Sequence, residues 1–385
     1  MHFGFSDEQL AMRDMARRFA EERLAPRYRE REAQGRIEPE LLEEMGGLGL
    51  IGIDLPEPLG GLDLGSVASG LIVEDIAGGD LNVSYVQLLA SLNGSIIATH
   101  ARPEIAQEIV PRVCEGRALL ALGLTEPGGG SDAANLKLRA ARTNAGYVLN
   151  GEKASISFAT QATEAIVFAR TGEQAARSRG ISAFVVPLDS PGVAVSGYDD
   201  VGSAAVGRGS IFFEDVEVPA ERMLAEENAA FRTVMSGFDY SRALIGLQCL
   251  AAAEVSLRET WTYATEREAF GAPIVRNQGV SEPLAEAETW IEAAKLLCYK
   301  TLWLRDRGEP HTAEAAMCKW WAPKVAFDVI HRCLLTHGHF AYTRDMPFEQ
   351  RLRDVMGLQI GDGTSQVQKM IIARERVGRV ALPHG

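Results

Sequence analysis

The chain has 385 residues, enough for two or three domains around a large core; 46% are hydrophobic and 24% charged, as is ordinary for a globular protein. Its formal net charge of -13 makes nucleic acid and anionic membrane surfaces poor partners. The five scattered cysteines include no Cys-x-x-Cys pair, which favours a reducing compartment and argues against disulfides and a thiolate metal site. No apolar run reaches the roughly 18 residues of a membrane span, and the N-terminus lacks a signal-peptide core, so we expect a cytoplasmic location and no membrane partner.

Residues 1–118 are predicted to form an N-terminal helical domain. Ser6, with Gln9 three residues later, has the pattern of a capping box, and apolar residues then recur at helical spacing. The same spacing predicts further helices over 39–49, 65–78, 84–101 and 104–116.

The pattern changes over residues 119–225, which are predicted to form a middle antiparallel β domain. Short β-rich segments alternate there with turn residues, over 118–124, 147–157, 165–171, 182–188, 192–198 and 210–218. Long helical periods return in 226–385, over 230–268, 279–306, 312–336 and 364–378, and predict a C-terminal four-helix-bundle domain. The predicted fold class is therefore α+β, in the order helical, β, helical.

A glycine-rich loop follows the first predicted strand, in the segment ALGLTEPGGGSDAAN (121–135). The next segment is patterned as strand, turn and strand, which excludes a Rossmann fingerprint because that motif needs a helix N-terminus for the pyrophosphate. A Gly-Lys-Ser/Thr run is also missing, so a P-loop is excluded. What remains is a polar turn with two hydroxyls, Thr125 and Ser131, and a plain hairpin turn is the alternative.

Three histidines cluster in HRCLLTHGH, at positions 331, 337 and 339. A His-x-His pair can bind a metal ion, but no group of carboxylates or thiolates accompanies it in the sequence. We therefore expect a polar helix end and no metal. No Gly-x-Ser-x-Gly elbow marks a hydrolase nucleophile either.

One acid near the C-terminus, Asp362, lies between Gly361 and Gly363 in QIGDGTSQVQK (359–369). Glycines on both sides leave the backbone free and remove steric cover from the carboxylate. Thr364 or Ser365 could cap the predicted helix that follows. The exposure of this one short acid just before a predicted helix needs an explanation.

A series of motifs, taken in order, resembles the acyl-CoA dehydrogenase family of flavoproteins. They are FSDEQLAMRD, LTEPGGGSD, NGEKASIS, FEDVEVPAERML, YATEREAFGAPI followed by Gln278, YTRDMPFEQRLRD and DGTSQVQKMIIAR. The resemblance covers almost the whole chain. It implies an α–β–α fold, FAD as cofactor, an acyl-CoA substrate, an electron-transferring flavoprotein as acceptor, and a homotetramer whose neighbouring subunits complete each flavin site.

The resemblance also implies roles for individual positions. The implied flavin contacts are Leu124, Thr125, Gly130, Ser131, Ile156, Ser157, Gly338, Thr364 and Gln366. The residues implied to reach the FAD of a partner subunit are Arg267, Phe270 and Gln278. The implied substrate contacts are Ser131, Asp239, Arg242, Gly361 and Gly363.

Asp362 falls where most members of the family carry a glutamate base, and Arg242 is expected close to it, keeping it ionised. Removing a proton next to a thioester carbonyl requires a carboxylate held dry at a fixed distance, which agrees with this assignment. Family members stabilise the thioester oxygen with the backbone N–H of the base residue and a flavin hydroxyl. A helix-capping loop acid is the plain alternative for Asp362.

Two departures from the family pattern bear on the substrate and on the acceptor. Asp362 is shorter than glutamate by about 1.5 Å, one carbon–carbon bond, and Gly361 replaces an aromatic residue. Together they favour an α-branched or cyclic acyl group, as in the branch that handles cyclohexane-carboxyl-CoA. Ser155 replaces a tryptophan that covers the flavin, and Phe158 is a candidate to fill its place. Some relatives carry the base on the substrate-facing helix, but Ser241 stands there and cannot substitute.

Two other function classes stay open at this point. One is a family offshoot with different chemistry, such as a nitroalkane oxidase, which uses an aspartate base, or an acyl-CoA desulfinase. The other is a non-catalytic or DNA-associated relative. The acidic charge weighs against the second, and the intact FDYSR segment favours a CoA ester over a small nitroalkane.

Overall fold

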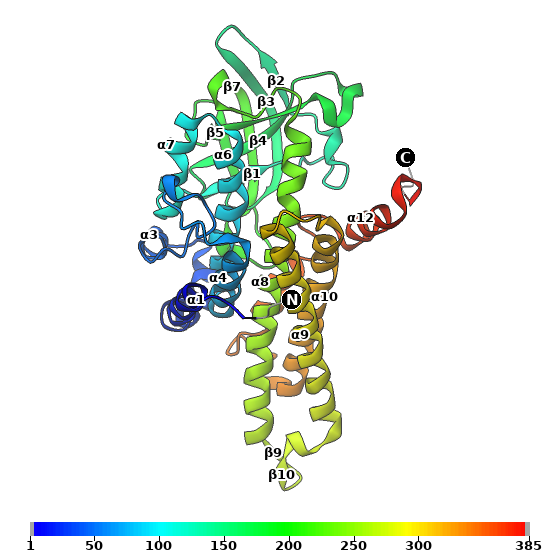
Figure 1. Cartoon of the computed structure of the whole chain (residues 1–385). Helices are drawn as coiled ribbons and strands as arrows, with labels where there is room; N and C mark the ends of the chain where they lie inside the picture. The colour runs from blue at the N-terminus through cyan, green and yellow to red at the C-terminus, as the bar shows by residue number, and fades with distance from the viewer. Residues whose placement is uncertain (1–3, 382–385) are drawn as a thin grey trace.

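The computed structural model describes residues 4–381, apart from the side chains of 232–236 and 379. A sheet of short strands lies at one end, N-terminal helices pack beside it, and a long helical bundle extends to the other end (Figure 1). The order helical, β, helical agrees with the prediction.

The N-terminal block consists of helices α1 (Asp7–Phe19), α2 (Tyr28–Gln34), α3 (Pro39–Gly47), α4 (Gly65–Gly79), α5 (Leu81–Leu89), α6 (Ser95–His100) and α7 (Pro103–Cys114). The capping box at Ser6 is confirmed: its side chain accepts from the backbone N–H of Gln9, whose side chain accepts in return. A π-helical turn, Ala90–Gly94, joins α5 to α6.

The continuous helix Leu81–His100 is long and apolar enough to cross a membrane. Its sequence contains no uninterrupted apolar run of that length, because polar residues interrupt it. However, 89% of its most apolar window is buried inside the protein. This burial is typical of a core helix, and the helix carries side chains into the centre of the molecule.

The middle block is an eight-stranded sheet in the order β6-β7-β3-β2-β4-β5-β8, with β1 also paired to β4. Its strands are β1 (Leu120–Gly123), β2 (Arg139–Arg142), β3 (Gly146–Ile156), β4 (Glu164–Arg170), β5 (Ile181–Pro187), β6 (Val193–Gly197), β7 (Gly209–Pro219) and β8 (Met223–Leu224). The sheet is mainly antiparallel, as predicted, but β1 and β2 pair with β4 in parallel. Every residue of β4 is buried, because one face packs on the helices and the other on a second, smaller core.

The C-terminal block is built on α8 (Ala230–Glu266), α9 (Gln278–Asp306) and α10 (Thr312–His337), followed by α11 (Phe348–Gly357) and α12 (Ser365–Val377). A small hairpin of β9 (Glu268–Ala269) and β10 (Ala272–Pro273) joins α8 to α9 at the end remote from the sheet (Figure 1). The four long helices were predicted to within a few residues, whereas the short α11 was not. In Figure 1 α12 projects from the bundle towards the C-terminus.

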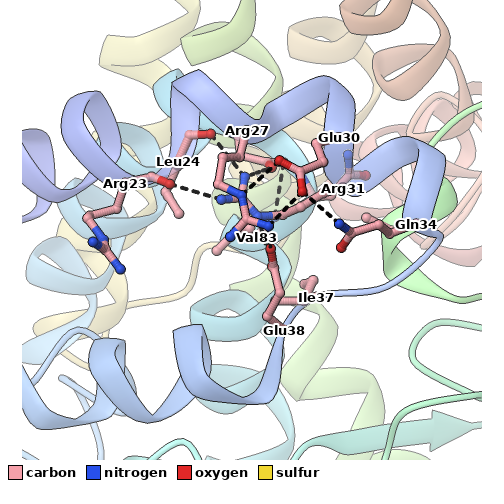
Figure 2. Close-up of polar contacts among 12 residues, drawn as sticks. Arg23, Leu24, Arg27, Glu30, Arg31, Gln34, Ile37, Glu38 and Val83 are labelled. Carbon is pink, nitrogen blue, oxygen red and sulfur yellow. Dashed lines mark hydrogen bonds and ion pairs between the residues drawn. The ribbon is translucent and has the colours of Figure 1, made fainter.

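A buried arginine ties the N-terminal helices together (Figure 2). The side chain of Arg31, 1% exposed, binds Asp80 at 2.8 Å and Glu38 at 3.1 Å, and donates to the carbonyls of Arg23 and Leu24. Asp80 also caps α5 through the N–H groups of its first turn. The arginine therefore satisfies carbonyls at one helix end and fixes the start of α5.

A second buried acid, Asp354, joins the three blocks. It accepts hydrogen bonds from Tyr28 Oη at 2.5 Å, Asn82 Nδ2 at 3.1 Å and the backbone N–H of Ser203 at 2.5 Å. Burial raises the pKa of Asp354 to about 6. These contacts join the β domain, through Ser203, to the helices α2, α5 and α11.

Candidate active site

Asp362 lies in the turn between α11 and α12, and the backbone of this turn favours a glycine beside it. Asp362 and Gly363 both have left-handed backbone angles, with φ of 54° and 94°. A Cβ atom on Gly363 would approach Gln368 Nε2 to 2.5 Å. Thr364, rather than Ser365, is the N-cap of α12. The turn therefore presents the half-buried Asp362 side chain towards the bundle while the next residue starts the helix.

Two side chains hold Asp362 in place. Ser241 Oγ, from the middle of α8, donates to Asp362 Oδ2 at 2.7 Å, and Ser241 is fully buried. Gln368, also fully buried, donates from Nε2 to the Asp362 carbonyl at 2.9 Å. One carboxylate oxygen is thus engaged, and within the described part of the chain the other has no hydrogen-bond partner.

Arg242 does not form the expected pair with Asp362. Its Nη1 lies 2.7 Å from Asp239 Oδ1, one helical turn away on α8, and Thr312 Oγ1 donates to the other oxygen of Asp239 at 2.6 Å. The buried Arg242 Nε has no hydrogen-bond partner among the described residues. The Nε–H group of Arg242 is therefore available to donate a hydrogen bond to a substrate carbonyl.

A buried lysine, Lys319 on α10, lies close enough to Asp362 for the two charges to interact. Its Nζ donates to the carbonyl of Leu358, at the end of α11, at 2.6 Å. Burial lowers the pKa of Lys319, while the nearby charge of Asp362 acts against this shift. The sequence analysis missed this residue, although a lysine among the apolar positions of a predicted helix is a detectable signal.

Tyr85 on α5 packs against the residues that follow strand β3. Its ring packs edge-on against Phe158, just beyond β3, with centroids 6.4 Å apart. Burial raises the pKa of the Tyr85 hydroxyl well above its usual value, and Asp362 is among the charges that raise it further. Tyr85 was not predicted as a site residue, because nothing in the sequence relates it to strand β3.

The glycine-rich loop (121–135) is anchored by a buried lysine on one side, and its glycines are open on the other. Buried Lys153 donates to the Leu124 carbonyl at 3.1 Å and binds Glu126 at 2.8 Å, and burial lowers the pKa of Lys153 to about 8. The Thr125 carbonyl accepts from Ala154, which brings the loop beside the end of β3.

This loop and the end of β3 fit a bound flavin. A Cβ atom on Gly128 or Gly129 would meet no atom within 4 Å, so the loop backbone is accessible. The structure shows no protein partner, within residues 4–381, for the side-chain hydroxyls of Thr125, Ser131 and Ser157. Loop backbone and hydroxyl groups therefore remain available for a polar ligand in this loop, which includes Gly130. The side chain of Ile156, by contrast, is buried in the core.

The residue expected to replace the missing tryptophan is not placed to do so. Phe158 is fully buried and points into the core, with a left-handed φ of 59°. Ser155, with a φ of 60°, is exposed, and its N–H donates to Tyr198 Oη at 3.2 Å. The end of β3 is consequently left uncovered at Ser155.

Three predicted flavin contacts lie far from this region. Arg267, Phe270 and Gln278 surround the β9–β10 hairpin, at the opposite end of α8 (Figure 1). At 1.5 Å per residue, the helix places them roughly 40 Å from Ser241. Phe270 is fully exposed and has a φ of 53°, which is unusual for a large side chain. Within one chain these residues cannot share a site with Thr125.

The remaining predicted positions lie at helix ends. Gly338 ends α10 with a φ of 66°, and Gln366 is exposed in the first turn of α12. His337, expected in a polar turn, is instead buried between Tyr263 and Phe348, with ring centroids 4.1 and 4.6 Å away. Burial lowers the pKa of His337, which favours the neutral ring.

Comparison with known proteins agrees with this architecture. Three family models match: the acyl-CoA dehydrogenase N-terminal domain over 6–117, the middle domain over 121–216 and the C-terminal domain over 228–376. The probable acyl-CoA dehydrogenase YngJ of Bacillus subtilis is 34% identical, over 97% of this chain and 99% of the relative. The caffeyl-CoA reductase-Etf complex subunit CarC of Acetobacterium woodii is 33% identical, over 96% and 98%.

A solved structure shows the same fold. The butyryl-CoA dehydrogenase from Megasphaera elsdenii superimposes with a TM-score of 0.94 at 33% identity, covering 98% of this chain and all of that one. Sequence and fold thus agree over nearly the full length. The chain belongs to the acyl-CoA dehydrogenase family of FAD-dependent oxidoreductases.

Proposed function

We propose that this acyl-CoA dehydrogenase uses Asp362 as its base and favours acyl-CoA esters with a ring or a branch at Cα. The observation that carries the proposal is the carboxylate itself, held in a left-handed turn with one oxygen bound to Ser241 and the other without a hydrogen-bond partner among the described residues. FAD, when bound, supplies the acceptor for the hydride that leaves Cβ. Asp362 takes the Cα proton, so that the Cα–Cβ double bond forms.

The polar groups around Asp362 suit a CoA thioester. Arg242 offers its buried Nε to a carbonyl of the substrate, and Asp239 keeps this guanidinium in place. Next to Asp239 opens a pocket of about 680 Å³ whose lining carries more acids than bases. This lining suits the neutral amide part of CoA, whereas the phosphates would be better placed in solvent.

We propose that the open space at the exposed Gly361 gives a ring room beside the base. A Cβ atom on Gly361 would meet only one atom within 4 Å, the carbonyl oxygen of Gly357 at 3.9 Å. An aromatic side chain at this position would occupy that room, and its absence leaves space next to Cα. A ring fixes Cα and Cβ rigidly, so that proton and hydride can be aligned at a lower entropic cost.

Substrate preference tests this proposal. Cyclohexane-carboxyl-CoA should exceed butyryl-CoA and octanoyl-CoA in kcat/KM by at least about tenfold, because each unburied methylene forfeits about 0.8 kcal/mol. The measurement is anaerobic flavin reduction across a panel of acyl-CoA esters. The double variant Gly361→Phe, Asp362→Glu should narrow or reverse the preference. Equal or faster turnover of the straight chains by the wild type would contradict the ring pocket and leave the family assignment standing.

The remote flavin contacts support a shared site between subunits. We propose a homotetramer in which the hairpin of one subunit, with Arg267 and Phe270, reaches the FAD of another; an exposed, strained phenylalanine is the kind of side chain that a partner covers. Electron transfer to an electron-transferring flavoprotein is proposed as well, since the relative CarC is named as a subunit of an Etf complex.

Replacing Phe270 with alanine should weaken FAD retention without disturbing the fold of the single chain. The side chain is fully exposed, so its loss removes no packing within the chain. The measurement is the ratio of FAD to protein after dilution and dialysis, together with size-exclusion chromatography. Val195→Ala, which removes an exposed apolar side chain from β6, serves as the matched control. Full FAD retention in the Phe270 variant would argue against the shared site.

A further inference from the structure

The hydrogen bond between Ser241 and Asp362 is the least expected feature of the site. Ser241 Oγ lies 2.7 Å from Asp362 Oδ2 and 3.2 Å from the carbonyl of Phe238. A hydroxyl has one proton to donate, and the carboxylate is both nearer and charged, so it receives the stronger bond. Ser241 is completely buried, which removes competition from water.

We infer that Ser241 is the positioning residue of the base: its hydroxyl fixes the short Asp362 side chain and leaves Oδ1 as the oxygen that takes the Cα proton. This inference rests on the proposed function, in which Asp362 is the base. Gln368 and the left-handed turn fix the backbone of Asp362, but among the described side chains only Ser241 holds its carboxylate by a hydrogen bond. A misplacement of about 1 Å can cost on the order of 100-fold in rate, so such a contact matters.

Charged and titratable groups from three helices also face Asp362. Lys319 on α10 and Tyr85 on α5 interact electrostatically with Asp362, and Arg242 on α8 interacts in the same way with Lys319. A hydroxyl that donates to the charged carboxylate favours its ionised form, in addition to these charges. Loss of the hydroxyl should therefore move the acid limb of the pH–rate profile to higher pH.

The test is Ser241→Ala in the FAD-loaded enzyme. Because a hydrogen bond to a charged group is lost, flavin reduction at saturating acyl-CoA should slow by about 10-fold to 100-fold. The Kd for a substrate analogue should stay within about twofold, since the hydroxyl faces the base. Ser256→Ala, which removes another buried hydroxyl from α8, should leave the rate and the profile unchanged. Ser241→Cys, nearly isosteric and a weaker donor, should give an intermediate rate and provides a second variant if the alanine variant does not fold.

A double-mutant cycle with Asp362→Glu separates positioning from packing. A longer acid carries its carboxylate past Ser241, so Ser241→Ala should cost much less in the Asp362→Glu background. Equal costs in the two backgrounds, or an unchanged rate and pH profile in the single variant, would overturn the inference. If Asp362→Asn is inactive in the same assay, such a result leaves the proposed base standing. Activity in Asp362→Asn would instead remove the proposed function itself.

Discussion

Replacing Asp362 with asparagine should slow flavin reduction by an acyl-CoA ester at least about 100-fold, while FAD stays bound and the fold is kept. An amide cannot accept the Cα proton, and general-base catalysis is worth about 100-fold to 10,000-fold. The amide nearly matches the carboxylate in size, and its oxygen can still accept from Ser241 Oγ. The measurement is anaerobic stopped-flow reduction of the flavin with each acyl-CoA ester.

Two comparisons sharpen this experiment. Asp328→Asn removes a carboxylate from the exposed surface of α10 and should reduce at the wild-type rate. Asp362→Glu introduces the longer acid that most family members carry. Unlike Asp362→Asn, this variant should keep at least part of the activity towards straight-chain acyl-CoA esters. Reduction of Asp362→Asn near the wild-type rate would show that another group removes the proton.

Replacing Arg31 with methionine should destabilise the protein by about 3–5 kcal/mol, because it leaves the buried carboxylate of Asp80 without its partner. Arg31 is 1% exposed and Asp80 0% exposed, and no water can replace the lost charge. The four contacts of the guanidinium described above disappear together, among them those with Leu24 and Glu38 in Figure 2. The measurement is the midpoint of thermal unfolding, followed by circular dichroism.

A neighbouring arginine provides the matched control. Arg27 also binds Glu38, at 3.0 Å, but its side chain is 46% exposed. Arg27→Met should therefore barely move the midpoint, since exposed ion pairs contribute little. The double variant Arg31→Met, Asp80→Asn should recover part of the loss, because asparagine still caps α5 without a buried charge. A single Arg31 variant as stable as Arg27→Met would contradict the expectation.

The cost of Arg31→Met should grow as the pH rises. Burial raises the pKa of Asp80 from 3.8 to about 7, although Arg31 opposes the shift. A carboxyl group whose folded pKa is raised contributes stability below its unfolded pKa and loses it as the pH rises through the folded pKa. Removing Arg31 raises the folded pKa further. The difference in unfolding midpoint between variant and wild type should therefore be larger at about pH 8 than at about pH 5.5. These two values lie on either side of the folded pKa of Asp80.

Arg31 also connects stability to the site. The Asp80 that it binds caps α5, and Tyr85 follows in the second turn of that helix. A loosened start of α5 would shift Tyr85 against Phe158 and the base. Activity measured well below the unfolding temperature would report this coupling separately from the loss of stability.

Local sequence patterns were enough to predict many of the helices and strands of this protein. The capping box at Ser6, the long helices α8, α9 and α10, and the strands around β4 depend on residues within a few positions of one another, so periodicity and turn residues reveal them. The pair of Asp239 with Arg242 belongs to the same class, because residues three apart on a helix are neighbours. The order of motifs was sufficient to indicate the family.

Tertiary structure alone decided which groups meet at Asp362. Ser241 is 121 positions away in the chain, and its hydroxyl reaches the carboxylate because α8 and the α11–α12 turn pack side by side. Lys319 and Tyr85 arrive from two further helices, and the expected pair of Arg242 with Asp362 gave way to the closer Asp239. Phe158 turned inward because the core beside Tyr85 accepts its ring. Such contacts depend on how helices pack over long sequence separations, and the spacing of residues in one sequence carries no measure of that packing.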